Sequence, residues 1–250
     1  MPKLSTLGLT DERSWQAVPV GIKLLVAAAL IAQLGWHGMQ PAPTARADAL
    51  PQAPDVTVTR IASLGEPIAA AQLLVLYLQA FDNQPGISIP FRDLDYPRVA
   101  GWLVAALQLD PDTGYPLMMA SQLYAQVNEA ARQRLMCDFV HGHFLANPEK
   151  RWRWLAHCAI MAKHRLHDPA LALRYANDIA LNAGNASSWA RQMRIFILED
   201  MGETESAKVL LGGLLATGEI TDPAELNFLT ERMQALEKYG KSTGSSKFRH

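Results

Sequence analysis

Cysteine is scarce in this chain and net charge is nearly absent. The two cysteines are Cys137 and Cys158, and the sequence has none of the paired C-x-x-C or H-E-x-x-H spacings that bind zinc. With 23 Lys and Arg against 24 Asp and Glu, the formal charge is −1, which excludes a global attraction to nucleic acid. There is also no G-x-S-x-G nucleophile motif and no convergent carboxylate pair. These absences favour a protein that is not an enzyme, has no cofactor and takes no small-molecule substrate.

Strand patterns are equally scarce. Asp55 to Arg60, DVTVTR, alternates like a strand but is short, so we expect an extended lead-in there. Downstream of Glu66, apolar residues recur at three- and four-residue spacing in segments bounded by Pro, Gly, Asn or Asp, one of them being Pro116–Val127. The predicted fold class is all-α, with a helical domain at 61–238 and a flexible tail at 239–250.

The long apolar run lies near the N-terminus. Val18 to Met39 contains a single formally charged residue, Lys23, and its core Leu24–Trp36 is free of charge. Its length approaches the roughly 20 residues that a helix needs to cross a bilayer. We therefore predict a transmembrane anchor at 18–39 after a short tail at 1–17.

A cleaved signal peptide is the alternative for this segment. Ala45-Arg46-Ala47 has the A-x-A form of a cleavage site, but it lies further beyond the apolar core than is usual, and Pro41 and Pro43 intervene. The uncleaved anchor is therefore favoured. Residues 40–60 are rich in Pro and Ala and have no apolar period, which is typical of a linker.

Basic residues flank the apolar run unevenly. Lys3, Arg13 and Lys23 precede it or lie at its start, whereas Arg46 follows it closely. The positive-inside rule then places the N-terminus in the cytoplasm. We expect a single-pass protein of the bacterial inner membrane with its C-terminal domain in the periplasm.

The helical segments repeat along the chain. A shift of 35 residues aligns Trp154 with Trp189 and Ala172 with Ala207, so that two helices and two turns recur in register. Small side chains at the alanine positions allow helices to approach closely, because interiors are densely packed.

This pattern resembles the tetratricopeptide-repeat (TPR) family, whose 34-residue unit has a glycine near the inter-helix turn and an alanine that opens the second helix. Gly202 and Ala207 match these positions, and His167 and Ala172 occupy them one unit earlier. Ala106–Pro111 resembles the ending of a unit. The resemblance implies a right-handed stack of antiparallel helix pairs, a TPR-like α-solenoid.

The resemblance covers about residues 66–218, with 224–238 as a capping helix. The chain departs from the family in the long loop 83–96 and in closing prolines that are missing at Gly184 and Glu219. Helical-repeat architecture is therefore a firmer expectation than the repeat register.

The stretch Gly202 to Val209, GETESAKV, is close to the phosphate-binding pattern G-x-x-x-x-G-K-[ST]. However, Ala207 stands where that pattern needs a glycine, Val209 stands where it needs a hydroxyl, and the preceding residues are helical in pattern rather than a strand. We interpret GETESAKV as a turn between two helices, with Lys208 solvated.

The TPR resemblance also implies that the first helix of each unit lines a concave groove for peptides or helices. Aromatic anchors among a few polar groups suit such a surface. The alternative is that these aromatics form interlayer core. The groove residues that the alignment implies are Tyr115, Met118, Gln122, Trp154, His157, Met161, His164, Arg165, Trp189, Gln192 and Phe196.

Cys137 and Cys158 flank a helix hairpin expected to turn near Pro148, at similar heights on adjacent antiparallel helices. Outside the cytoplasm such a pair can form a disulfide that closes a loop of about 20 residues. Two buried thiols that face different ways are the alternative. His141 and His157 lie nearby, but the adjacent His157 and Cys158 cannot point the same way on a helix, so we predict no metal site.

The sequence thus predicts a membrane-anchored, TPR-like adaptor or scaffold that binds another protein in the bacterial cell envelope. Two alternatives stay open at this point. One is a secreted Cys/His metal-binding protein or enzyme. The other is a structural subunit of a membrane complex that uses its outer helix faces.

Overall fold

The computed structural model describes residues 18–40, 47–218 and 220–246, and most of these are helical. The chain divides into two units, Met1–Arg46 and Ala47–His250. In the first unit, helix α1 (Val20–Met39) buries none of its residues. It is long and apolar enough to cross a membrane.

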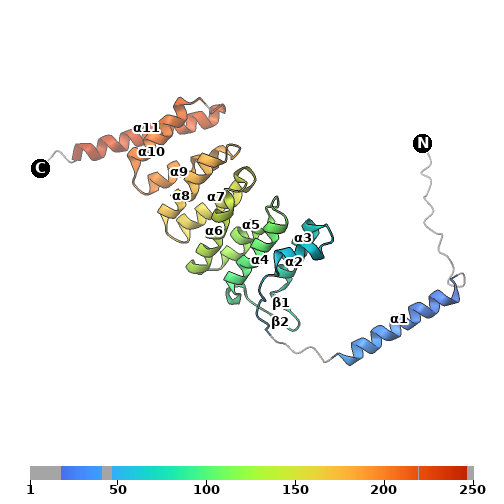
Figure 1. Cartoon of the computed structure of the whole chain (residues 1–250). Helices are drawn as coiled ribbons and strands as arrows, with labels where there is room; N and C mark the ends of the chain where they lie inside the picture. The colour runs from blue at the N-terminus through green and yellow to red at the C-terminus, as the bar shows by residue number, and fades with distance from the viewer. Residues whose placement is uncertain (1–17, 41–46, 219, 247–250) are drawn as a thin grey trace, which may run out of the picture. The chain divides into compact units, whose positions relative to one another are not determined.

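The second unit is a series of helices joined by short turns (Figure 1). Its α-helices in chain order are α2 (Val56–Ala62), α3 (Pro67–Ala80), α4 (Tyr96–Leu109), α5 (Tyr115–Met118), α6 (Ala130–Phe144), α7 (Pro148–His164), α8 (Pro169–Asn182), α9 (Ser188–Asp200), α10 (Thr204–Ala216) and α11 (Pro223–Ser246). The expected all-α class is confirmed for the described residues.

Shorter elements interrupt this series in two places. Between α3 and α4, the strands β1 (Asn83–Gln84) and β2 (Ile87–Ser88) form a small antiparallel hairpin, followed by the 3-10 turn η2 (Phe91–Asp93). After α5 come a π-helical segment, η3 (Met119–Leu123), and a 3-10 turn, η4 (Tyr124–Gln126). The long loop predicted between the first two helices of the domain is therefore partly ordered by backbone pairing.

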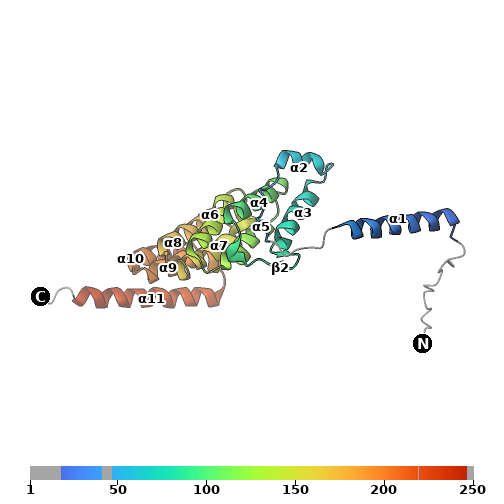
Figure 2. The ribbon, with the colours of Figure 1, turned by 90° about the horizontal axis from the view of Figure 1, so that it is seen from below.

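Helices that are neighbours in the chain pack against one another. Contacts join α3 to α4, α6 to α7, α7 to α8, α8 to α9, and α10 to both α9 and α11, as the row of helices in Figure 2 shows. Local sequence sets where they begin: the side chains of Asp95, Asn147 and Asp168 accept hydrogen bonds from backbone N–H groups in the first turns of α4, α7 and α8. Each of these three helices also has a proline in its first turn, where the missing N–H costs nothing.

The two aligned turns of the sequence have matching backbones. His167 before α8 and Gly202 before α10 both adopt positive φ, 51° and 79°. Ala172 and Ala207, five residues later, are both completely buried. The predicted helix–turn–helix recurrence is present at both positions.

GETESAKV is confirmed as such a turn. The residues before Gly202 belong to α9, so the strand that a phosphate loop requires does not precede it. Lys208 lies on α10 and its Nζ is 2.7 Å from Oε1 of Glu205. The predicted solvation of Lys208 is wrong, because only 16% of its side chain is exposed and its partner is the intrahelical carboxylate of Glu205.

The core falls into two clusters of buried side chains. The larger runs from Leu50 to Ile197 through α3, α4, the segment 115–126, and α6 to α9. The smaller joins α9, α10 and α11 through Ile195, Leu211 and Leu229. The last two helices therefore depend on a small apolar cluster of their own.

The extended lead-in predicted at Asp55 to Arg60 is wrong, because α2 begins at Val56. The Asp55 carboxylate accepts a hydrogen bond from the Val58 N–H and caps the helix, which overrides the alternating pattern. The chain also packs on the helical body before residue 61. Leu50 is buried, and the Trp102 indole N–H donates to the Pro51 carbonyl.

The predicted boundary at the C-terminal end is also wrong, because α11 continues to Ser246 rather than ending at 238. Residues 1–17, 41–46, 219 and 247–250 lie outside the described residues. The predicted N-terminal tail, residues 41–46 of the predicted linker and the end of the C-terminal tail fall among them.

Candidate functional site

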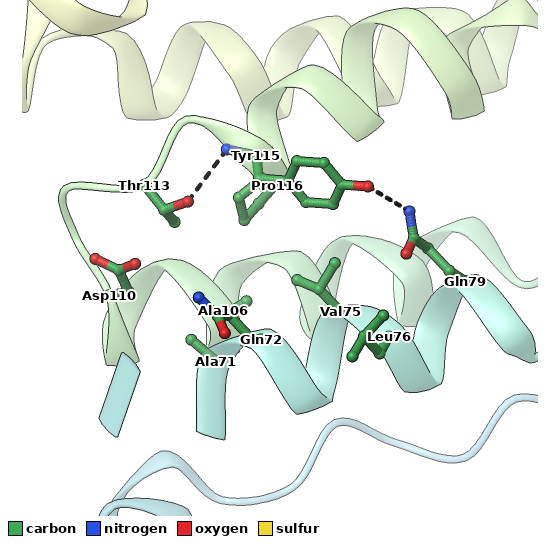
Figure 3. A pocket seen from close by; sticks show the side chains of 10 residues that line it. All are labelled: Ala71, Gln72, Val75, Leu76, Gln79, Ala106, Asp110, Thr113, Tyr115 and Pro116. Atoms are coloured by element: carbon green, nitrogen blue, oxygen red, sulfur yellow. Dashed lines mark hydrogen bonds between the residues drawn. The ribbon is translucent and has the colours of Figure 1, made fainter. Parts of the chain in front are cut away.

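A cavity of about 380 Å³ opens between α3, α4 and the start of α5 (Figure 3). Its lining combines small and apolar side chains with a few uncharged polar ones and one carboxylate. The lining residues are Ala71, Gln72, Val75, Leu76, Gln79, Ala106, Asp110, Thr113, Tyr115 and Pro116. Such a volume fits one or two amino-acid side chains, so the cavity suits a segment of polypeptide.

Hydrogen bonds fix the polar groups of this cavity. The Gln79 side-chain amide donates to the Tyr115 hydroxyl over 2.6 Å, and the Tyr115 N–H donates to the Thr113 hydroxyl over 3.3 Å (Figure 3). The first bond joins α3 to α5 across the cavity. Its breakage would free an amide and a phenol to bond a ligand instead.

The helix that carries Tyr115 is irregular. We expected a regular helix over Pro116–Val127, but the structure has a π-helical segment at Met119–Leu123 and a 3-10 turn after it. Inside it, the buried Ser121 hydroxyl donates to the Leu117 carbonyl over 2.9 Å, a bond that competes with the regular helical ladder. π-Helical turns occur frequently at functional sites, and this one adjoins the cavity.

Trp154 of α7 lies against the corner that leads into α5. A side-chain Cβ at Gly114 would sit 3.1 Å from the indole Nε1, so glycine leaves the room that this ring occupies. The ring is half-buried and packs on the main core. Its Nε1 is buried and has no hydrogen-bond partner among the described residues. Trp154 is therefore largely a packing residue.

His157, one turn further along α7, faces the end of the irregular helix. Its Nε2 lies 3.3 Å from the Gln126 amide nitrogen, and Arg165 donates to the Gln126 carbonyl over 3.3 Å. Burial lowers the pKa of His157, and the nearby positive charge of Arg165 lowers it further. The histidine is thus biased toward its neutral form, which can both donate and accept a hydrogen bond.

The predicted groove residues differ in what they present to solvent. Met161 and Gln192 are buried, so they do not belong to the exposed surface that the alignment implied. Met118, Trp154, His157 and Phe196 are half-buried, whereas Tyr115, Gln122, His164, Arg165 and Trp189 are exposed. The surface available to a partner is therefore smaller than the predicted set.

Trp189 on α9 is the most open aromatic of that set, with 52% of its surface exposed. Its ring meets the buried ring of Trp152 edge to face, with centroids 6.0 Å apart. Packing on one side holds the indole in place while the other side stays in solvent. Trp189 therefore lies at the edge of the packed core with one side of its ring open.

A second cavity, of about 340 Å³, lies between α8, α9, α10 and α11 and includes Gln192 in its lining. The Gln192 amide donates to the Glu225 carboxylate, which ties α9 to α11. Arg194 also lines it; its Nε is buried without a hydrogen-bond partner among the described residues, and burial lowers its pKa. This cavity is more polar than the one beside Tyr115 and belongs to the C-terminal end.

Cys137 on α6 and Cys158 on α7 are both fully buried free thiols. Burial raises the pKa of the Cys158 thiol well above its usual range, and a hydrogen bond with Cys137 adds to the effect. The two thiols therefore lie close enough to influence each other's ionisation. A disulfide between them stays a prediction that depends on the compartment.

The histidines near the two cysteines, His141 and His143, form hydrogen bonds with an aspartate and a backbone carbonyl rather than with one another. His141 Nε2 lies 2.6 Å from Asp178 Oδ2 on α8, and His143 Nδ1 lies 2.8 Å from the Phe139 carbonyl oxygen. Over the part of the chain that the structure describes, no group of three or more His, Cys, Asp and Glu could hold a metal ion.

Sequence reasoning missed most of the cavity beside Tyr115. Gln72 and Gln79 come from α3, whereas Asp110 and Thr113 come from the turn after α4, and no spacing rule brings the two segments together. The available signal was the lack of charge in Pro67–Ala80, which suggests an unusual surface on that helix. Comparison with protein-family models, curated proteins and solved structures finds no match to this chain.

Proposed function

We propose that this chain is a single-pass membrane protein whose helical body binds a segment of another protein and has no catalytic role. In this proposal the helix pairs form a right-handed, TPR-like stack. The body lies in the periplasm of a bacterium, tethered to the inner membrane by α1. Its role is that of an adaptor or scaffold.

The observation that carries the proposal is the cavity beside Tyr115. It is lined by three helical segments and has an apolar floor at Val75 and Ala106. A hydrogen bond holds the Gln79 amide and the Tyr115 hydroxyl in fixed positions, and Asp110 adds one carboxylate to the lining. Peptide-binding sites combine apolar pockets for side chains with a few oriented polar groups.

The groups beyond the cavity suggest the chemistry of the partner segment. Arg165 and His164 are exposed at the end of α7, and Trp189 is exposed at the start of α9. An apolar side chain of the partner would enter the cavity, while an acidic residue further along would meet the guanidinium of Arg165 at the end of α7. The segment is therefore an apolar–acidic stretch of polypeptide.

The experiment is site-specific photocrosslinking in intact membranes of cells that produce the full chain. The crosslinking amino acid replaces Gln122 or Trp189 on the proposed binding surface, and replaces Leu181 or Val209 as controls. Both control side chains are 74% exposed and lie on the second helices α8 and α10.

The proposal predicts one discrete adduct from Gln122 and Trp189 that is lost when Tyr115→Ala is added, and none from the control positions. Equal adducts from all four positions, or adducts that survive Tyr115→Ala, would contradict it.

A further inference from the structure

Helix α3 is apolar on two opposite sides. One side packs on α4 through the buried Ala71, Val75 and Leu78. On the other side, Leu73 is 65% exposed and Leu76 is 58% exposed. No residue of Pro67–Ala80 is charged. An uncharged helix with apolar side chains on two sides is normally covered on both of them. Among the described residues, the main packing partners of α3 are α4 and α2 (Figure 2), and a hydrogen bond from Gln79 joins it to α5.

The short helix α2 adds to the same end of the body. Val58, Ile61 and Leu64 recur every three residues and are all exposed. Leu64, at the corner before α3, is 92% exposed and has a positive φ of 52°. A bulky residue rarely adopts this conformation, because it strains the backbone. The fold accepts this strain at a position where the leucine side chain is exposed to solvent.

We name this surface the N-terminal apolar face; its members are Val58, Ile61, Leu64, Ile68 and Leu73. Leu76 lies at its border with the cavity beside Tyr115, which it also lines. Exposed apolar patches of this kind mark contacts with protein or membrane. We infer that the N-terminal apolar face rests on the lipid bilayer that α1 crosses, so that the helical body touches the membrane at a second point. This inference depends on the membrane anchoring proposed above.

The length of chain between the two units supports a bilayer as the occupant. α1 ends at Met39, and the chain is already packed on the helical body at Asp48, whose N–H donates to the Gln84 side chain over 2.9 Å. The residues between Met39 and Asp48 can span at most about 30 Å, since each extends the chain by roughly 3.6 Å. The start of the helical body is therefore held within this distance of the end of a membrane-spanning α1.

The charged and aromatic residues of this region also support a bilayer as the occupant. Arg60 and Glu66 are the formally charged residues of 56–80, and Arg60 turns toward α4, where it donates to the Gln108 carbonyl over 2.7 Å. A face with no net charge neither attracts nor repels headgroups, so its contact with lipid is driven by apolar burial. Tyr77 is partly exposed beside it and stacks on Trp102, with centroids 4.8 Å apart. Tyrosine and tryptophan are the residues enriched at membrane–water interfaces.

The test uses the full chain reconstituted in phosphatidylcholine vesicles and labelled with an environment-sensitive fluorophore at Leu73→Cys. The matched control carries the label at Val209→Cys, an aliphatic position of similar exposure on α10. The native cysteines are buried, so the unsubstituted chain gives the labelling background. Brominated lipids report contact with acyl chains.

The inference predicts that brominated lipid quenches the label at Leu73→Cys several-fold more than the label at Val209→Cys, with little dependence on salt. Equal quenching at the two positions would overturn it. A change at Leu73→Cys that disappears at one chain per vesicle would assign the face to a second copy and also overturn it.

Alkaline extraction of the same vesicles separates the two proposals. If alkaline treatment releases the chain from the vesicles, the proposed membrane anchoring by α1 is wrong. If α1 resists extraction but the label at Leu73→Cys behaves as in the control, only the bilayer contact of the helical body fails. A second variant, Ile68→Gln combined with the label at Ile61→Cys, should halve the quenching without unfolding the body, because Ile68 is exposed and does not line the cavity beside Tyr115.

Discussion

Helices α3 and α11 lie near opposite ends of the helical body and differ in the side chains that they expose to solvent. α11 buries Leu229 and Leu236 against α10 and exposes the charged side chains of Glu231, Arg232, Glu237 and Lys238. α3 exposes leucine instead and carries no charge. The last helix of a stack needs a polar outer side to stay in water, and α11 meets this requirement. The contrast supports the inference that a bilayer covers the α3 end of the body, whereas the outer side of α11 suits water.

Truncating a leucine at each end should give the largest difference. Leu229 of α11 is fully buried, so Leu229→Ala should lower the free energy of unfolding by about 2–5 kcal/mol through lost burial and an unfilled cavity. Leu73→Ala should change it by less than about 0.5 kcal/mol in detergent, because that side chain is exposed. Denaturant unfolding of both variants measures the difference, and a large loss from Leu73→Ala would show that α3 is covered within the chain itself.

An ion pair clamps α11 to the body and has no counterpart on the outer side of α3 among the described residues. Arg232 Nε lies 2.7 Å from Oε2 of Glu199, whose side chain is almost buried. Arg232→Met should leave this carboxylate without its partner and lower stability by about 1–3 kcal/mol. Arg232→Lys is the control and should lose less. Equal losses in the two variants, measured by thermal unfolding, would mean that the charge has no role.

A surface ion pair in the middle of the helical body, Arg134 with Asp168, should give a smaller effect that depends on pH. Asp168 caps α8 and bonds Arg134 of α6, and this bond is the main reason that its pKa lies below the usual range. A depressed pKa in the folded state stabilises the protein above about pH 4 and the benefit is lost as pH falls through the folded value.

Asp168→Asn keeps a good capping side chain but loses the charge, so it should lower stability by about 0.5 kcal/mol at pH 7. The difference from the original chain should vanish near pH 2. Unfolding measured at both pH values checks this, and a difference that does not change with pH would rule out the ion pair as its cause.

The repeat and its turns could be predicted from the sequence because their signals are local. Small residues at Ala172 and Ala207 and the matching turns at His167 and Gly202 lie at a fixed spacing. α2 was missed because alternating Thr and Val resemble a strand, while the decisive signal was the capping carboxylate of Asp55.

The site was less predictable because it depends on contacts between distant segments. Tyr115 was identified by its place in the repeat, but its partner Gln79 lies 36 residues away on a helix with no marked polar pattern. The burial of Met161 and Gln192 follows from the rotation of α7 and α9 against their neighbours, which spacing alone does not fix.

Both proposals depend on α1 as an uncleaved anchor with the helical body outside the cytoplasm. The most direct measurement is a chain with an N-terminal epitope tag and a reporter that is active only in the periplasm, fused after His250 because α11 continues to Ser246. We expect one membrane band that carries both the tag and an active reporter and resists alkaline extraction. An inactive reporter, or an active reporter on a soluble band without the tag, would contradict the membrane-anchored scaffold.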